Sequence, residues 1–212
     1  MEIYQTEEQQ VDAMKKYWQD NGNAIIAGLV IGFSAFIGYN FYKDAQLEQE
    51  LSTSESYQIT QELVGKDEQA YTKAGEKFIA ENGESSYASL TALALAKESA
   101  NHKDWPQVEK YLATAIAKAT DAGIKGIATL RLARVQIQLD QIEKALVTLS
   151  SPLPESFKAT VEEIKGDAYL KQDKKDLARN AYQAALNVND QAGNSALQIK
   201  LDDLAETINL GK

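Results

Sequence analysis

The chain has 212 residues, with 22 Lys or Arg against 31 Asp or Glu, so its formal net charge is −9 at pH 7. It has no Cys and a single His, His102, which excludes disulfides, thiolate metal sites and sites with two histidine ligands. The acidic balance also argues against nucleic acid as a partner, because binding to the phosphate backbone requires a basic surface.

The first 22 residues form a short segment with five acidic and two basic residues. Val11, Met14, Tyr17 and Trp18 recur at three- and four-residue spacing with charged residues between them, which is typical of an amphipathic helix. We therefore expect residues 1–22 to form a short amphipathic segment that leads into a membrane. It could serve as an anchor at the membrane surface or could bind a cytoplasmic partner.

A long uncharged stretch follows this segment. No Asp, Glu, Lys or Arg occurs between Asn21 and Tyr42, and residues 24–42 read AIIAGLVIGFSAFIGYNFY. As a helix this stretch spans roughly 28 Å, close to the ~30 Å hydrocarbon thickness of a lipid bilayer. A core helix rarely stays uncharged for so long, and a cleavable signal peptide would have a basic start and a shorter apolar run. The sequence predicts one transmembrane helix over residues 23–42.

Small residues share one face of the predicted transmembrane helix. Ala24, Gly28 and Gly32 stand at four-residue spacing. Such a face lets a second membrane helix approach closely, so we expect these residues to pack against another membrane protein or a second copy of the chain. Because glycine is common in membrane helices, incidental glycines in a lone anchor are the alternative.

The flanking charges favour one orientation of the chain. Lys15, Lys16 and the terminal amine precede the uncharged stretch, whereas only Lys43 closely follows it. The positive-inside rule then places the N-terminus in the cytoplasm. The C-terminal part would be periplasmic, and a chain without Cys is compatible with that oxidising compartment.

The rest of the sequence is typical of helices. It is rich in Ala, Leu, Glu, Lys and Gln, and helix-breaking residues stand in short clusters between the expected helices. No window alternates as a strand would. The sequence predicts an all-α fold, with a connecting helix over residues 43–66 and a helical domain over residues 67–212.

Small and large apolar residues recur in register within this helical domain. The matched positions are Ala96, Ala133 and Gly166; Val108, Ala145 and Ala178; Leu112, Leu149 and Tyr182; and Ala115, Pro152 and Ala185. The spacing resembles the tetratricopeptide repeat, in which stacked helix pairs of about 34 residues bury a continuous core. We expect such an α-solenoid, with a generic Ala-rich helical bundle as the alternative.

The two ends of the predicted solenoid carry further apolar residues. Ala74 and Phe78 indicate a partial unit before the first repeat. Leu197, Leu201, Leu204 and Ile208 form an apolar stripe that would cap the last repeat.

Motifs for catalysis and cofactor binding are absent from the sequence. It contains no G-x-x-x-x-G-K-[ST], G-x-G-x-x-G, H-E-x-x-H or G-x-S-x-G. His102 stands in the polar turn Asn-His-Lys-Asp, where we expect a solvated side chain rather than a general base. We predict a protein that is not an enzyme, with no catalytic residue, no cofactor and no metal site. The minority hypothesis is a hydrolase that uses His102.

Several short segments spread over nearly the whole chain indicate a family. They are Met1-Glu2-Ile3-Tyr4, Gln10-Val11-Asp12-Ala13 before Lys15-Lys16, Asn21-Gly22, Glu76-Lys77-Phe78 with Ala80-Glu81-Asn82, and the run Arg131-Leu132-Ala133-Arg134-Val135-Gln136. Together with the single span and the repeats, they closely resemble the YfgM family of ancillary SecYEG translocon subunits.

The resemblance implies a location and a set of partners. It implies a bacterial inner-membrane protein that crosses the lipid bilayer once, with a cytoplasmic N-terminus and a periplasmic tetratricopeptide domain. The implied partners are the SecYEG translocon, the periplasmic chaperone PpiD and translocating polypeptides, which the protein would help to transfer to periplasmic chaperones. Some family members are linked to an envelope stress response, so a regulator that acts through its cytoplasmic N-terminus is the alternative.

The resemblance to tetratricopeptide repeats also implies a binding groove, because the first helices of such repeats line a concave side. The residues that this pattern places in the groove are Lys97, Asn101, Arg134, Gln138, Asp167 and Lys171. Their mixed charges suit contacts with peptides or proteins. For Arg134, an ion pair with a neighbouring carboxylate that stabilises the fold is the alternative.

Overall fold

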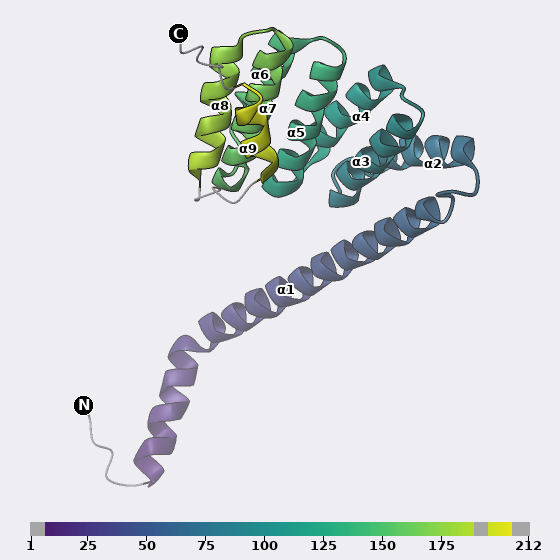
Figure 1. The fold of residues 1–212 in the computed structure, drawn as a ribbon. Helices are drawn as coiled ribbons and strands as arrows, with labels where there is room; N and C mark the ends of the chain where they lie inside the picture. The colour runs from purple at the N-terminus through teal and green to yellow at the C-terminus, as the bar shows by residue number, and fades with distance from the viewer. Residues whose placement is uncertain (1–6, 189–194, 205–212) are drawn as a thin grey trace, which may run out of the picture. The chain divides into compact units, whose positions relative to one another are not determined.

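The computed structural model describes residues 7–188 and 195–204, which form helices and contain no strand (Figure 1). The helices are α1 (Glu7–Gln61), α2 (Glu68–Glu81), α3 (Ser86–Asn101), α4 (Trp105–Lys118), α5 (Ala122–Gln138), α6 (Ile142–Leu149), the 3₁₀ helix η1 (Glu155–Phe157), α7 (Lys158–Lys171), α8 (Lys175–Asn187) and α9 (Ser195–Asp202). The chain divides into two compact units, Met1–Ser52 and Thr53–Lys212. The predicted all-α fold, with one long apolar N-terminal helix and a helical-repeat domain, is confirmed.

Helix α1 is continuous over 55 residues. No proline interrupts it, and none of its glycines is adjacent to another, so the backbone ladder is not broken. The predicted boundaries of the transmembrane helix, at residues 22 and 42, lie inside α1. The predicted end of the connecting helix, at residue 66, follows the end of α1. These three limits stay predictions. The last residues of α1, 53–61, belong to the second unit.

Aspartate side chains begin several helices of the second unit. The carboxylates of Asp67, Asp104 and Asp121 accept hydrogen bonds from backbone N–H groups three residues later, at the starts of α2, α4 and α5. Each bond satisfies a donor that has no partner within its own helix. The polar clusters of the sequence therefore set where helices start as well as where the chain turns.

Left-handed residues mark the turn inside each helix pair. Gly65, Lys103, Asp140 and Asp173 have φ angles of 73°, 59°, 61° and 58°, and they follow one another at steps of 38, 37 and 33 residues. The turns after α3, α5 and α7 share a further bond, in which the N–H groups of Asp104, Gln141 and Lys174 donate to the carbonyls of Ser99, Gln136 and Tyr169. This pattern is the Schellman motif, which ends a helix with a left-handed residue. The backbone thus repeats in phase with the sequence.

The end of α1 and helix α2 form an additional helix pair before the first complete repeat. Gly65 supplies the left-handed turn between them. The ring of Tyr57 lies 4.7 Å from the ring of Tyr87 on α3 and 6.0 Å from that of Phe78 on α2, measured between centroids. The partial unit that Ala74 and Phe78 indicated is therefore built with the last turns of α1 as its first helix.

The residues in register form the core of the repeats. Eleven of the twelve matched positions are buried: Ala96, Val108, Leu112, Ala115, Ala133, Ala145, Leu149, Gly166, Ala178, Tyr182 and Ala185. The exception is Pro152, which is exposed beyond the end of α6. Pro152 is the position where the second unit departs from the small-residue pattern, and α6 stops at Leu149 because Pro152 and Pro154 cannot continue a helix.

Glycine allows two close approaches in this core. A Cβ atom on Gly166 of α7 would collide with the ring of Tyr182 on α8, and one on Gly126 of α5 would collide with the ring of Phe157. Tyr182 is fully buried. The small residue that the repeat pattern predicts at position 166 is therefore a steric requirement of the α7–α8 crossing.

Helix α9 covers the end of the described solenoid. Leu197 and Leu204 are buried in one cluster with Ala178, Tyr182 and Ala185 of α8, and Leu201 packs against this cluster. These contacts are those of the predicted cap. Ile208, the last residue of the predicted stripe, lies outside the described residues.

Candidate functional site

Residues 24–42 of α1 are the uncharged stretch, which we call the apolar segment. Helix α1 is long and apolar enough to cross a membrane, and no part of its most apolar 18 residues is buried. Its exposed large side chains are Ile26, Leu29, Val30, Ile31, Phe33, Phe36 and Ile37. The core helix of a soluble domain would bury such side chains, because water-exposed apolar surface of this extent is rare. The segment therefore requires lipid or other apolar groups around it.

The predicted packing face of this segment is open. Ala24, Gly28 and Gly32, which we call the small face, are exposed. A Cβ atom added at Gly28 or Gly32 would meet nothing within 4 Å. Among the described residues, no helix fills the space beside these glycines, so a second helix could approach the α1 backbone closely.

The six predicted groove residues lie on the first helices of three successive repeats. Helix α3 carries Lys97 and Asn101, α5 carries Arg134 and Gln138, and α7 carries Asp167 and Lys171. Helix α5 contacts both α3 and α7. We call these six residues the first-helix set. All are exposed except Asp167, which is half-buried.

Asp167 is engaged within the fold. Its carboxylate accepts hydrogen bonds of 2.7 Å from the hydroxyl of Tyr182 and of 2.7 Å from the ammonium of Lys200 on α9. Lys200 also donates to Glu163, at 2.8 Å. Burial tends to lower the pKa of Lys200, but the two carboxylates more than offset this, and the pKa is raised. Asp167 thus serves to dock α9 on α7 and α8.

The cations of the first-helix set have no such partners. Lys97, Arg134 and Lys171 form no ion pair with any residue in the described ranges 7–188 and 195–204. The alternative role of Arg134 was an ion pair that stabilises the fold. No described carboxylate forms such a pair with Arg134. Among the described residues, the first-helix set therefore holds three cations without an ion pair, on a protein whose net charge is −9.

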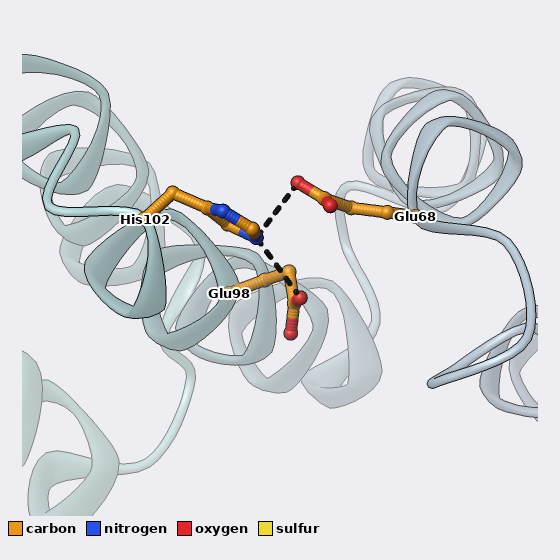
Figure 2. A group of neighbouring side chains, drawn as sticks. All are labelled: Glu68, Glu98 and His102. Atoms are coloured by element: carbon orange, nitrogen blue, oxygen red, sulfur yellow. Dashed lines mark ion pairs between the residues drawn. The ribbon is translucent and has the colours of Figure 1, made fainter.

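Sequence reasoning missed a second cluster of polar side chains, which Figure 2 shows. The Nε2 atom of His102 lies 3.0 Å from a carboxylate oxygen of Glu68 and 3.6 Å from one of Glu98. The pair Glu98 and His102 has the i, i+4 spacing of one helix face and was visible in the sequence. Glu68 was not, because it comes from the start of α2 and only the fold brings it to the end of α3.

Known proteins resemble this chain over nearly its full length. The tetratricopeptide repeat-like domain family matches residues 15–206. A protein of Escherichia coli (strain K12) named ancillary SecYEG translocon subunit is 33% identical over 206 residues, which are 97% of this chain and 100% of the relative. Proteins of the same name are 31% identical in Haemophilus influenzae, over 93% of this chain and 97% of the relative, and 29% identical in Neisseria gonorrhoeae, over 96% and 100%.

A solved structure supports the fold alone. The structure titled MamA 41-end from Desulfovibrio magneticus RS-1 superposes with a TM-score of 0.51 at 13% sequence identity, and covers 72% of this chain and 94% of the MamA chain. The apolar helix and the relatives together make this chain a membrane-anchored protein with a tetratricopeptide-like domain. The chain belongs to the YfgM family of ancillary SecYEG translocon subunits.

Proposed function

We propose that this protein is an ancillary subunit of the SecYEG translocon that helps to pass translocated polypeptides, together with PpiD, to periplasmic chaperones. The observation that carries the proposal is the likeness over 97% of the chain to a relative named for that complex. The role is one of binding and positioning, and none of its steps requires the protein to make or break a covalent bond.

The apolar segment of α1 would dock in the membrane against a translocon subunit. Without water, helix association depends on close packing rather than on hydrophobic burial, and small residues allow that packing. Gly28 and Gly32 leave their side of the helix open. The N-terminus would remain in the cytoplasm, so that the repeat domain is held in the periplasm.

The repeat domain would bind protein segments along the first-helix set. Lys97, Arg134 and Lys171 have no partner among the described carboxylates and can attract acidic or backbone-carbonyl groups of an extended chain. Anchoring the domain in the same membrane as the translocon raises its effective concentration near emerging polypeptides. Modest affinity at the groove is then enough for transfer.

Site-specific photocrosslinking tests both surfaces. A photoreactive amino acid at Gly28 should capture a membrane subunit of SecYEG, and one at Arg134 should capture PpiD or a translocating polypeptide. The matched control in the membrane is Val30, which lies about 200° around the helix from Gly28 at ~100° per residue. The control in the repeat domain is Val147 on the second helix α6, which is 70% exposed.

Each surface has its own contradicting outcome. Equal capture from Gly28 and Val30 would contradict docking through the small face. Equal capture from Arg134 and Val147 would contradict binding along the first-helix set. Capture of neither a SecYEG subunit nor PpiD from any of the positions would overturn the proposed function.

A further inference from the structure

Two carboxylates and an imidazole meet where α2 begins and α3 ends. Glu68 is the first residue of α2, whereas Glu98 and His102 lie near the end of α3. Figure 2 shows the His102 ring paired with both carboxylates. One ligand atom from each of the three side chains lies within 4.8 Å of the other two. None of the three residues belongs to the first-helix set, although Asn101 of that set donates a hydrogen bond to Glu98. The inference drawn from the cluster does not depend on the proposed function.

The distances in this cluster are close to those of a tetrahedral metal site. Zinc bonds to imidazole nitrogen and to carboxylate oxygen are about 2.0–2.2 Å long, so neighbouring ligand atoms in a tetrahedron are roughly 3.3 Å apart. The Nε2 atom of His102 is 3.0 Å from Glu68 and 3.6 Å from Glu98. Two edges of the tetrahedron thus have nearly the required length, and the third edge, between the two carboxylates, is no longer than 4.8 Å.

Neighbouring groups hold these side chains in place. The side-chain amide of Asn101 donates to the Oε2 atom of Glu98, at 3.4 Å. The Oε1 atom of Glu98 then lies beside His102. The side chain of Asp67 accepts a hydrogen bond of 2.9 Å from the N–H of Ala70 and so fixes the first turn of α2, from which Glu68 projects. Outer contacts of this kind orient metal ligands.

We propose that Glu68, Glu98 and His102 bind one Zn²⁺ ion, with water in the fourth position. Two carboxylates and a neutral imidazole carry a charge of about −2, which a divalent cation balances. Imidazole as a ligand favours zinc over the oxygen-binding ions Mg²⁺ and Ca²⁺. The bound ion would join α2 to α3 and so tie the helix pair formed with the end of α1 to the first complete repeat.

The single histidine makes the test direct. The full chain is prepared in detergent micelles without a histidine tag and with ¹⁵N-labelled histidine, so every imidazole signal belongs to His102. Titration with ZnCl₂ should shift the Nε2 signal and saturate at one equivalent, whereas MgCl₂ should leave it unchanged. Glu68→Gln and Glu98→Gln should each raise the zinc dissociation constant at least about tenfold.

Glu155→Gln is the matched control, because Glu155 is exposed and pairs with Lys158, away from the cluster. This variant should bind zinc as the unaltered chain does. Circular dichroism of each variant verifies that the helices remain, so a change in affinity is not a change in folding. Absence of any shift of the His102 signal with millimolar zinc would overturn the proposal. So would zinc affinity that stays the same in Glu68→Gln and Glu98→Gln.

Discussion

Glycines occupy opposite environments in the two units of the chain. In the repeat domain, a Cβ atom on Gly166 would collide with Tyr182, and one on Gly126 would collide with Phe157. In the apolar segment of α1, the same atom on Gly28 or Gly32 would meet nothing within 4 Å. The repeat domain uses small residues to let its own helices cross closely, whereas the small face of the apolar segment has no described helix against it.

Large apolar side chains show the same difference. Leu95, Leu112 and Ile164 are buried within the repeat domain, while Phe33 and Phe36 of the apolar segment are exposed. The domain buries its large apolar side chains within one chain, whereas the apolar segment requires lipid or other apolar groups around it. Substitutions in the domain should therefore change the free energy of unfolding, and substitutions on the small face should change association instead.

The largest effect on stability is expected from Gly166→Ala. The added methyl group forces the fully buried ring of Tyr182 out of its position, which should lower the free energy of unfolding by about 3 kcal/mol. Gly28→Ala adds the same group in open space and should leave this free energy unchanged. Urea unfolding followed by near-ultraviolet circular dichroism measures both variants, and equal midpoints would contradict the comparison.

Gln136→Leu should destabilise the repeat domain by about 2 kcal/mol. Gln136 is 2% exposed, and it donates to Glu109 of α4 at 3.3 Å and accepts from the hydroxyl of Thr148 of α6 at 2.7 Å. The leucine would leave both partners without these bonds. Gln138→Leu on the same helix is exposed and should cost less than about 0.5 kcal/mol. Chemical denaturation of the two variants distinguishes a buried network from a surface effect.

Alkaline pH should destabilise the repeat domain through its buried tyrosines. Burial raises the pKa values of Tyr71, Tyr111 and Tyr182, and the carboxylate of Asp167 raises that of Tyr182 further. A raised pKa means that the stabilising contribution is complete below the unfolded value of about 10 and is lost as the pH rises above it. The free energy of unfolding should therefore fall above about pH 10.

Tyr182→Phe separates this effect from general alkaline unfolding. The variant loses the hydrogen bond to Asp167 and should be about 1 kcal/mol less stable at pH 7. Its stability should then fall less steeply than that of the unaltered chain between pH 9 and about pH 11. Urea midpoints at a series of pH values provide the measurement. Parallel curves for the two proteins would show that Tyr182 does not contribute.

Within the first-helix set, a small effect on stability is expected from Arg134→Ala. No described residue forms an ion pair with Arg134, so the free energy of unfolding should change by less than about 0.5 kcal/mol. Asp167→Ala should cost more, since it leaves Lys200 and the Tyr182 hydroxyl without their shared acceptor. Urea denaturation measures the free energy of unfolding of both variants. A large loss in Arg134→Ala would identify it as a structural residue.

Local patterns carried most of the fold prediction. The positions of Ala96, Ala133 and Gly166 reflect a helical period and a repeat length, both of which are properties of short sequence windows. Pro152 departs from the repeat pattern already in the sequence, and in the structure it lies beyond the end of α6, because proline cannot continue a helix.

Contacts between distant parts of the chain could not be read from the sequence. The register of α7 placed Asp167 with the groove residues, but Lys200 reaches it from α9, which the chain brings back over the last repeat. Glu68 meets His102 in the same way, by the packing of α2 beside α3. Such pairs have no spacing rule, so only the fold reveals them.

Affinity purification in mild detergent tests the central claim most directly. The unaltered chain, the double variant Gly28→Ile with Gly32→Ile, and the control Gly38→Ile are each isolated from membranes with their bound proteins. Gly38 has the same open surroundings and lies about 80° around the helix from Gly28 at ~100° per residue. We expect SecYEG subunits with the unaltered chain and with Gly38→Ile, and their loss from the double variant. SecYEG retained equally by all three, or absent from all three, would contradict docking through the small face of α1.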